Sequence, residues 1–251
     1  MLLRRVFLSA LLALAVTQAL AAEGFVIESN GANMAVGAAV ENGSAISIPA
    51  GGHLVILTSS GQMLRRNGPF EGTGEEALGA AGSGAKGGGA KASALDALVD
   101  LALEKGTATD RVFATRSSNR NTNAGPFSIT PETRTYCHRS DVAPAFVLSP
   151  PPAQDLPLML DRTSRPKSSQ NAYWPAGQPR IVWPQDWPPL EKGSYEWSAG
   201  FAQGAFSVKV ISAKAVPSDL LAVAAELKRQ GCSDQAWIAL QGAIMRAPVI
   251  E

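Results

Sequence analysis

Histidine and cysteine, which supply many catalytic bases, reactive thiols and zinc ligands, are scarce in this chain. Its 251 residues contain two of each. The cysteines do not form the Cys-x-x-Cys pair of thiol redox enzymes, and the four residues have no recognised zinc-ligand spacing. No Gly-x-Ser-x-Gly sequence marks a nucleophile elbow. We therefore predict that the protein is not an enzyme and has no catalytic, metal-binding or cofactor-binding residues.

The ionisable side chains that are present form no obvious constellation. His138 directly follows Cys137, and neighbouring side chains on a strand point to opposite faces, so these two residues make a poor dyad. His53 opens a separate predicted strand. The acids considered for a glycosidase pair are dispersed among prolines, turns and a glycine-rich segment: Glu75, Glu76, Asp155, Asp161, Asp186 and Glu191. Two such acids must flank the same bond, and the sequence nominates no pair that does.

An excess of charge of one sign is also missing. The chain has 22 basic and 21 acidic residues, and no extended run of lysine or arginine follows residue 21. Nucleic acids and anionic lipid surfaces both favour clustered positive charge, so neither is expected as a partner. Beyond the N-terminal region, no apolar run approaches the roughly 20 residues of a membrane-spanning helix. We therefore expect no stable membrane insertion once the N-terminal segment is removed.

The N-terminal segment has the three-part pattern of a secretory signal peptide. Arg4 and Arg5 supply a positive start, residues 6–16 form an apolar run broken only by Ser9, and residues 19–21 offer small side chains for cleavage. The run is about half as long as a membrane span needs, which favours a cleaved signal at residues 1–21 over a membrane anchor. No cysteine follows the cleavage site, so no lipid anchor is expected. The expected location is the bacterial periplasm or the exterior.

The two cysteines have a ready interpretation in such an oxidising compartment. Cys137 and Cys232 lie 232 − 137 = 95 positions apart, and an even pair in an exported protein favours a disulfide. Closing a loop of that size stabilises a fold by about 4–5 kcal/mol in the chain-entropy model. A catalytic thiol and two buried free thiols are the alternatives. The prediction is a structural disulfide.

Residues 22–71 contain short apolar stretches separated by glycine and proline, which is typical of a small β unit. Residues 45–48 alternate apolar and small side chains, residues 49–52 form a turn, and residues 53–58 are a stronger apolar strand. This stretch, ENGSAISIPAGGHLVILTSSGQMLRRNGPF, is similar to the FecR-like β-domains of bacterial envelope proteins. The resemblance implies a fold of short strands and turns. It implies no functional residue, and it does not carry over transmembrane signalling, because the membrane helix and cytoplasmic segment of FecR have no counterpart in the sequence.

Residues 72–92 are rich in glycine and alanine and are predicted to be a flexible linker. Lys86 and Lys91 lie among the glycines, but the spacing is not that of a phosphate-binding loop. Residues 93–134 are predicted to contain one helix, capped by Ser93 and stopped at Gly106, and a connecting segment. Within that segment, residues 112–115 are a strand candidate and residues 117–123 a polar loop. The apolar side of the helix is expected to be core rather than a docking face.

Residues 135–251 carry most of the aromatic residues, and short strands separated by prolines predict an antiparallel β-sandwich. Residues 194–197 and 206–210 alternate clearly, so one face of each strand should be buried. The order of these strands resembles the later half of an immunoglobulin-like sheet in pattern only. The C-terminus then becomes helical: Asp219 starts one helix, Gly231 stops it, and Ser233 with Asp234 is expected to cap a second. The fold class predicted is therefore mainly β with a few helices, in which a small N-terminal β unit is tethered to a sandwich with a C-terminal helical hairpin.

An aromatic cluster is the one feature that suggests a contact surface. Five aromatic residues fall close together among prolines and could bind a protein partner or a glycan if exposed: Tyr173, Trp174, Trp183, Trp187 and Tyr195. Packing in the sandwich core is the competing interpretation, and the one that the sequence favours. Trp187, between Asp186 and two prolines, is expected to be the most exposed of the five.

The functional expectation is an exported, non-catalytic binding or assembly module of the cell envelope that contacts another envelope protein. The alternatives are a hydrolase or carbohydrate-active enzyme that acts on envelope polymer, and an accessory sensor without its own membrane segment. A cleft with convergent acids would favour an enzyme. An apolar patch or an unpaired strand edge would favour a binding module. The sequence does not predict the oligomeric state.

Overall fold

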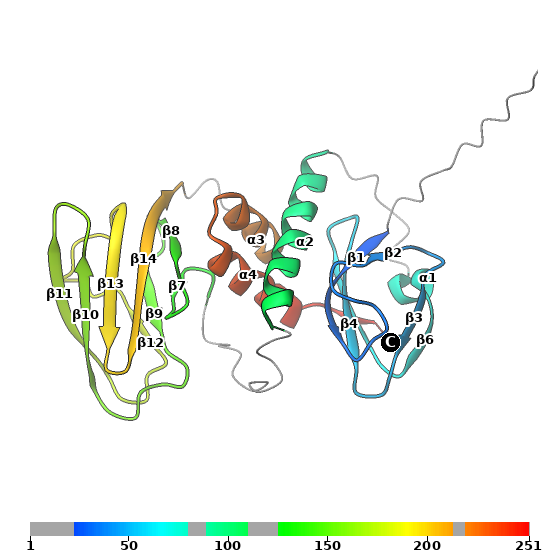
Figure 1. Cartoon of the computed structure of the whole chain (residues 1–251), viewed down its shortest axis with the longest axis horizontal. Coiled ribbons are helices and arrows are strands. Elements are labelled where there is room, and N and C mark those ends of the chain that lie inside the picture. Colours follow the sequence, from blue (N-terminus) through cyan, green and yellow to red (C-terminus); the bar gives the residue numbers. More distant parts are fainter. Residues whose placement is uncertain (1–22, 80–88, 110–124, 213–218, 251) are drawn as a thin grey trace, which may run out of the picture.

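The computed structural model describes residues 23–79, 89–109, 125–212 and 219–250 and places a layer of helices between two β units (Figure 1). The chain is mainly β with a few helices, which confirms the predicted fold class. The predicted signal peptide, the expected strand at residues 112–115 and the expected loop at residues 117–123 lie outside the described residues. Within the described ranges, no helix combines the length and hydropathy that crossing a bilayer requires.

The N-terminal unit is built from two small sheets. One has the order β15-β5-β4-β1-β2, and the other pairs β3 with β6. Their bounds are β1 Gly24–Asn30, β2 Ala39–Val40, β3 Ala45–Ile48, β4 His53–Thr58, β5 Met63–Asn67, β6 Phe70–Thr73 and β15 Val249–Ile250. Leu54 and Ile56 of β4 pack into the core between the two sheets, whereas Val55 and Leu57 pack toward the helices. Strand β4 is therefore buried on both faces, which explains its nearly continuous apolar sequence.

A short helix, α1 (Gly74–Leu78), completes this unit where the sequence predicted the linker to begin. Thr73 caps it: the Thr73 hydroxyl accepts from the Glu76 backbone N–H, and the Glu76 carboxylate accepts from the Thr73 N–H. The buried guanidinium of Arg66 donates to the Glu76 carbonyl oxygen at the other end. Residues 72–79 are thus ordered parts of the β unit, and the prediction of a linker there is wrong. Of the 72–92 segment, residues 80–88 lie outside the described part.

The helical layer consists of α2 (Gly89–Thr109), α3 (Leu220–Arg229) and α4 (Ser233–Met245). Helix α2 starts before the expected cap Ser93 and continues past Gly106, because burial of its apolar side outweighs the low helix propensity of glycine. Asp219 caps α3 as predicted, by accepting from the Ala222 N–H at 3.0 Å. The expected cap of α4 is wrong. Cys232 is its N-cap residue, without a side-chain cap bond, and Asp234 lies in the first turn.

One hydrophobic core joins the helices to both β units. Leu98 and Leu101 of α2 pack in it with Ile27 and Val55 of the N-terminal sheet and Ile211 of the C-terminal sheet. The sequence left open whether the two β units pack together, and the structure packs both against the same helices. The C-terminus even returns to the N-terminal unit, where β15 pairs with β5.

The C-terminal unit is a sandwich of a five-stranded sheet, order β11-β10-β13-β14-β8, and a three-stranded sheet, order β12-β9-β7. The strands are β7 Ser128–Ile129, β8 Thr135–Arg139, β9 Ala145–Val147, β10 Leu156–Arg162, β11 Ser168–Trp174, β12 Arg180–Val182, β13 Gly193–Ala199 and β14 Ala202–Ile211. The sandwich begins before the predicted boundary at residue 135, because β7 belongs to it. It is also not purely antiparallel, since β8 runs parallel to β14 and β7 parallel to β9. Sequence alternation identifies strands without fixing their direction, which explains this error.

The predicted disulfide is present between Cys137 of β8 and Cys232, with their Cα atoms 6.0 Å apart. Both residues are fully buried in the core shared by the helices and the sheets. Nearby, the buried side chain of Gln235 accepts from the Cys137 N–H and donates to the Pro126 carbonyl oxygen at 3.0 Å. The disulfide therefore fixes the start of α4 on the edge strand of the sandwich.

Candidate functional site

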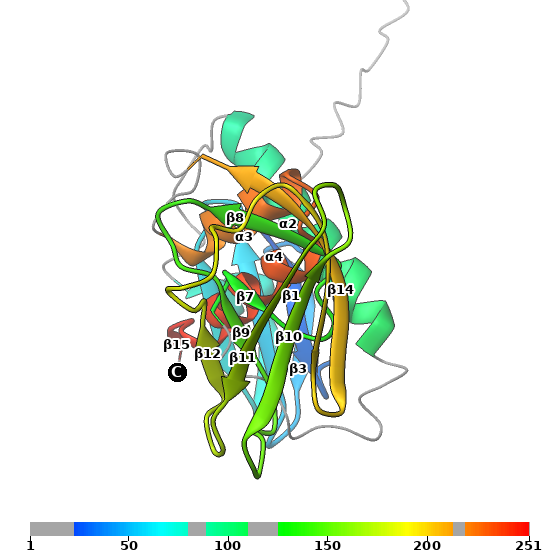
Figure 2. The same ribbon diagram turned by 90° about the vertical axis from the view of Figure 1, so that its left-hand side faces the viewer.

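Strand β14 has an edge that is open over half of its length. On one side β13 pairs with it from Ala202 to Val208, whereas on the other side β8 pairs only from Ser207 onward. The Ser207 N–H donates to the Arg134 carbonyl oxygen at 2.9 Å, so the peptide groups of Ser207 point away from β13. Peptide groups alternate in direction along an antiparallel strand, so those of Gln203 and Ala205 point outward too. No strand in the described residues pairs with them there. Figure 2, in which the sandwich faces the viewer, shows β14 on the right-hand side of the five-stranded sheet.

A tight turn at residues 130–134 lies beside this edge. The Thr130 N–H donates to the Thr133 hydroxyl at 2.9 Å, and the Thr133 N–H donates to the Thr130 carbonyl oxygen at 3.1 Å. Both threonine side chains are buried. Because these bonds close the turn internally, the chain leaves the line of β8 at Arg134 and does not continue along β14.

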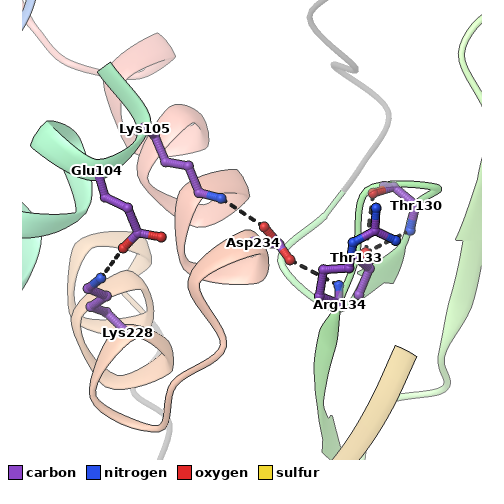
Figure 3. A network of polar contacts seen from close by, with 7 residues as sticks. All are labelled: Glu104, Lys105, Thr130, Thr133, Arg134, Lys228 and Asp234. Atoms are coloured by element: carbon purple, nitrogen blue, oxygen red, sulfur yellow. Dashed lines mark hydrogen bonds and ion pairs between the residues drawn. The ribbon is translucent and has the colours of Figure 1, made fainter. Parts of the chain in front are cut away.

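Helix α4 holds the turn in place. Asp234 accepts from the Arg134 N–H at 3.0 Å with one carboxylate oxygen and from the Lys105 ammonium at 2.8 Å with the other (Figure 3). A second ion pair, between Glu104 and Lys228, joins α2 to α3 beside it. Pairs of this exposure contribute about 1 kcal/mol or less each. The Asp234 carboxylate mainly fixes the position of the turn, because it connects α2, α4 and the turn.

Two adjoining cavities of about 460 Å³ each lie along the open edge, and both include Pro131 and Gln203 in their walls. The first extends over the outer face of the five-stranded sheet. The second extends to Leu148 and to Phe201, at the tip of the β13–β14 hairpin. The Phe201 side chain is 80% exposed. Together the two cavities form one cleft, which we call the β14 cleft.

A buried donor without a partner lies at the bottom of the β14 cleft. Trp197 is 3% exposed, and its indole Nε1 has no hydrogen-bond partner among the described residues. The nitrogen packs directly against Gly204, where an added Cβ would lie only 2.6 Å from it. Buried polar groups are nearly always hydrogen-bonded, so an unpaired one in a cleft wall indicates a missing acceptor. Glycine at position 204 leaves room for the indole itself, and the Pro131 carbonyl oxygen lies near the same position.

Two carboxylates lie side by side on the outer face of the sheet at the same cleft. Asp161 of β10 is directly opposite Glu196 of β13, and both residues line the first cavity. Side chains in such cross-strand positions have Cβ atoms about 5 Å apart, and like charges there are unfavourable. Neither carboxylate forms an ion pair with a described residue. The exposed Arg134 is the cation that shares their cavity, so the site has an excess of negative charge.

The predicted aromatic cluster lies elsewhere and is mostly internal. Trp174, Trp187 and Tyr195 are 0%, 5% and 6% exposed and belong to the sandwich core, and Trp183 is half-buried and stacks on Phe146. Tyr173 is 76% exposed, so the expectation that Trp187 is the most exposed member is wrong. Nearby backbone carbonyls accept from the polar tip of each ring, so the rings can be buried without unpaired donors.

The two histidines lie apart from the β14 cleft, and the buried Nδ1 of His138 has no hydrogen-bond partner among the described residues. His53 pairs with Glu28 across β4 and β1 at 2.9 Å. His138 is buried on β8 beside Tyr136, and burial lowers the pKa of its imidazole below the ordinary value, while the nearby Asp141 acts in the opposite direction. In the described part of the chain, histidine, cysteine and carboxylate side chains do not gather in groups of three or more.

Neither a known protein family, nor a curated protein, nor a solved structure matches this chain. The similarity of the N-terminal unit to FecR-like domains therefore stays a prediction. The β14 cleft was not among the sites expected from the sequence. The one sequence signal for it is Phe201, a large apolar residue directly after Gly200 in a hairpin connection, where polar residues are usual.

Proposed function

We propose that the protein is an exported, non-catalytic binding or assembly module of the cell envelope, and that it contacts another envelope protein through the β14 cleft. The observation that carries this proposal is the open edge of β14 beside the exposed ring of Phe201. Unpaired strand edges are templates for pairing with another chain, and soluble proteins usually cover or charge them. An exposed aromatic at the end of such an edge adds apolar area that a partner can bury.

Export of the chain is supported by the pattern of residues 1–21, and the disulfide fits an oxidising compartment. The mode of contact is supported by the geometry of the sheet. A peptide strand added to an edge gains main-chain hydrogen bonds for affinity and side-chain pockets for specificity. The β14 cleft offers both, because outward peptide groups lie between two cavities.

The experiment that tests this function is crosslinking in the cell. A photo-crosslinking amino acid replaces Phe201 in one variant and Val182, which is 50% exposed on β12, in a control variant. After irradiation the tagged protein is purified from the envelope fraction and its adducts are identified. We expect one reproducible protein adduct from position 201 and none from position 182. Recovery of the protein alone, from these positions and from a wider set of exposed positions, would contradict the proposed function.

A further inference from the structure

We propose that the segment recognised in the β14 cleft is an extended stretch of a partner protein that carries a lysine or arginine, and that it adds to the five-stranded sheet as a short strand beside residues 203–206. This inference rests on the proposed function and specifies the chemistry of the partner. Three features carry it: the outward peptide groups, the excess of negative charge from Asp161 and Glu196, and the unpartnered indole nitrogen.

The backbone limits the occupant to a single short strand. The outward N–H and C=O groups of Gln203 and Ala205 offer hydrogen bonds over four residues, between the hairpin tip and the first pair with β8 at Ser207. The turn at residues 130–134 and β8 itself flank this opening. A second copy of the chain would bring its own β8 and its own turn to the same place, so two copies obstruct each other. A flexible segment meets no such obstruction.

The charge of the cleft favours a basic residue on that segment. Neighbouring strands lie about 4.8 Å apart, so an added strand would lie about 10 Å from β13. An extended lysine or arginine side chain on its outer face, together with the side chain of Glu196, covers that distance, with Asp161 directly behind Glu196. A cation there relieves the repulsion between the two carboxylates. An acidic residue at the same place would increase it.

The indole of Trp197 supplies the third feature. Its Nε1–H is buried and lacks an acceptor among the described residues, and it lies against the backbone of Gly204, inside the stretch that the partner would cover. An added strand brings carbonyl oxygens, which are acceptors, to this part of the sheet. Glu196 and Trp197 are consecutive on β13, the strand next to β14, so the carboxylate and the indole lie on opposite faces of the sheet. One strand beside β14 therefore contacts both.

The test uses two fluorescein-labelled heptapeptides that alternate threonine and valine and differ only in a central lysine or glutamate. Fluorescence anisotropy measures their binding to the protein, and amide NMR shifts locate it. We expect the lysine peptide to bind about tenfold more tightly than its glutamate twin. In the protein, the amide signals of Gln203 and Ala205 should shift. Shifts at the β11 edge instead, around Asn171, would overturn the proposal, and so would the absence of binding.

Variants of the protein separate the contributions that backbone hydrogen bonds and charge make to peptide binding. Ala205→Pro removes one outward N–H without removing a bond to β13, and it should abolish binding of both peptides. Asp161→Asn with Glu196→Gln should make the two peptides bind equally. Glu71→Gln, on an exposed carboxylate of the N-terminal unit, is the matched control and should change nothing. A lysine preference that survives in the Asp161/Glu196 variant would overturn the charge assignment. A protein crosslinked at position 201, together with failure of the peptides, would retain the proposed function and reject strand addition.

Discussion

The two five-stranded sheets of this protein differ in how far one of their edges is covered by another strand. In the N-terminal sheet, β15 returns from the far end of the chain to pair with β5, and the Arg65 N–H donates to the Pro248 carbonyl oxygen at 3.0 Å. In the C-terminal sheet, β8 pairs with β14 from Ser207 onward. The turn at residues 130–134 leads the chain away from residues 202–206 of β14. The same protein therefore covers β5 with its own C-terminus and leaves half of β14 uncovered. Unpaired edges invite association, so an open one beside an exposed phenylalanine indicates a contact site.

The largest effect is expected from the disulfide, which anchors α4 and hence the turn beside β14. Replacing Cys137 and Cys232 by serine should lower the free energy of unfolding by about 4–5 kcal/mol, because the unfolded chain regains the freedom of a long loop. Guanidinium unfolding of the variant and the oxidised protein measures the difference. Thiol titration of the unfolded, unreduced protein is the control. Reaction of two thiols would show that the bond is absent.

The next largest effect contrasts a buried and an exposed aromatic of the sandwich. Trp187→Ala should cost about 3–5 kcal/mol of stability, because it leaves a cavity beside Phe146 and Trp183. Phe201→Ala should change stability by about 0.5 kcal/mol or less, because the ring is mostly in solvent. Thermal and denaturant unfolding of both variants checks the contrast. If Phe201→Ala were as destabilising as Trp187→Ala, the ring would not be free for a partner.

Local pattern was sufficient to predict many of the elements. Alternation predicted β13 and the middle of β14, and Asp219 and Gly231 gave the ends of α3, where Gly231 adopts a positive φ of 77°. Even the disulfide followed from compartment and cysteine count. In each case the signal lies within a few residues or in a property of the whole chain.

Features that depend on which strands become neighbours could not be predicted in this way. Strand β15 has two residues and no periodicity, and its pairing with β5 is a long-range contact. The opposition of Asp161 and Glu196 depends on the register between β10 and β13, which no local pattern encodes. The open edge of β14 arises because β8 starts late and runs parallel. The candidate site is therefore a property of topology, and the aromatic cluster, for which the sequence favoured packing in the core, gave no indication of it.

Removing β15 would uncover the edge of β5 and test the comparison between the two sheets. Deleting residues 249–251 removes the pairing of β15 with β5 and the packing of Ile250 against the N-terminal core. The expected loss is about 1–2 kcal/mol, the contribution of a few net hydrogen bonds and some apolar contact. Denaturant unfolding measures it, and light scattering measures the self-association expected of a new open edge. Val249→Lys, which retains the backbone pairing at a half-exposed position, is the control.

The smallest effect concerns the covered half of β14, where His138 of β8 faces the sandwich core beside Tyr136. Burial lowers the folded-state pKa of this imidazole below its unfolded value of about 6.5. The unfolded chain therefore binds more protons between these two pKa values, and the free energy of unfolding should fall as the pH decreases through this window. Asp141 opposes the shift only in part; its own pKa is lowered mainly by Arg139, so it stays ionised there. His138→Phe keeps an aromatic ring without the titration, so its stability relative to the wild type should rise as the pH falls from 7 to 5. A constant difference across that range would show that burial does not lower the pKa of this imidazole.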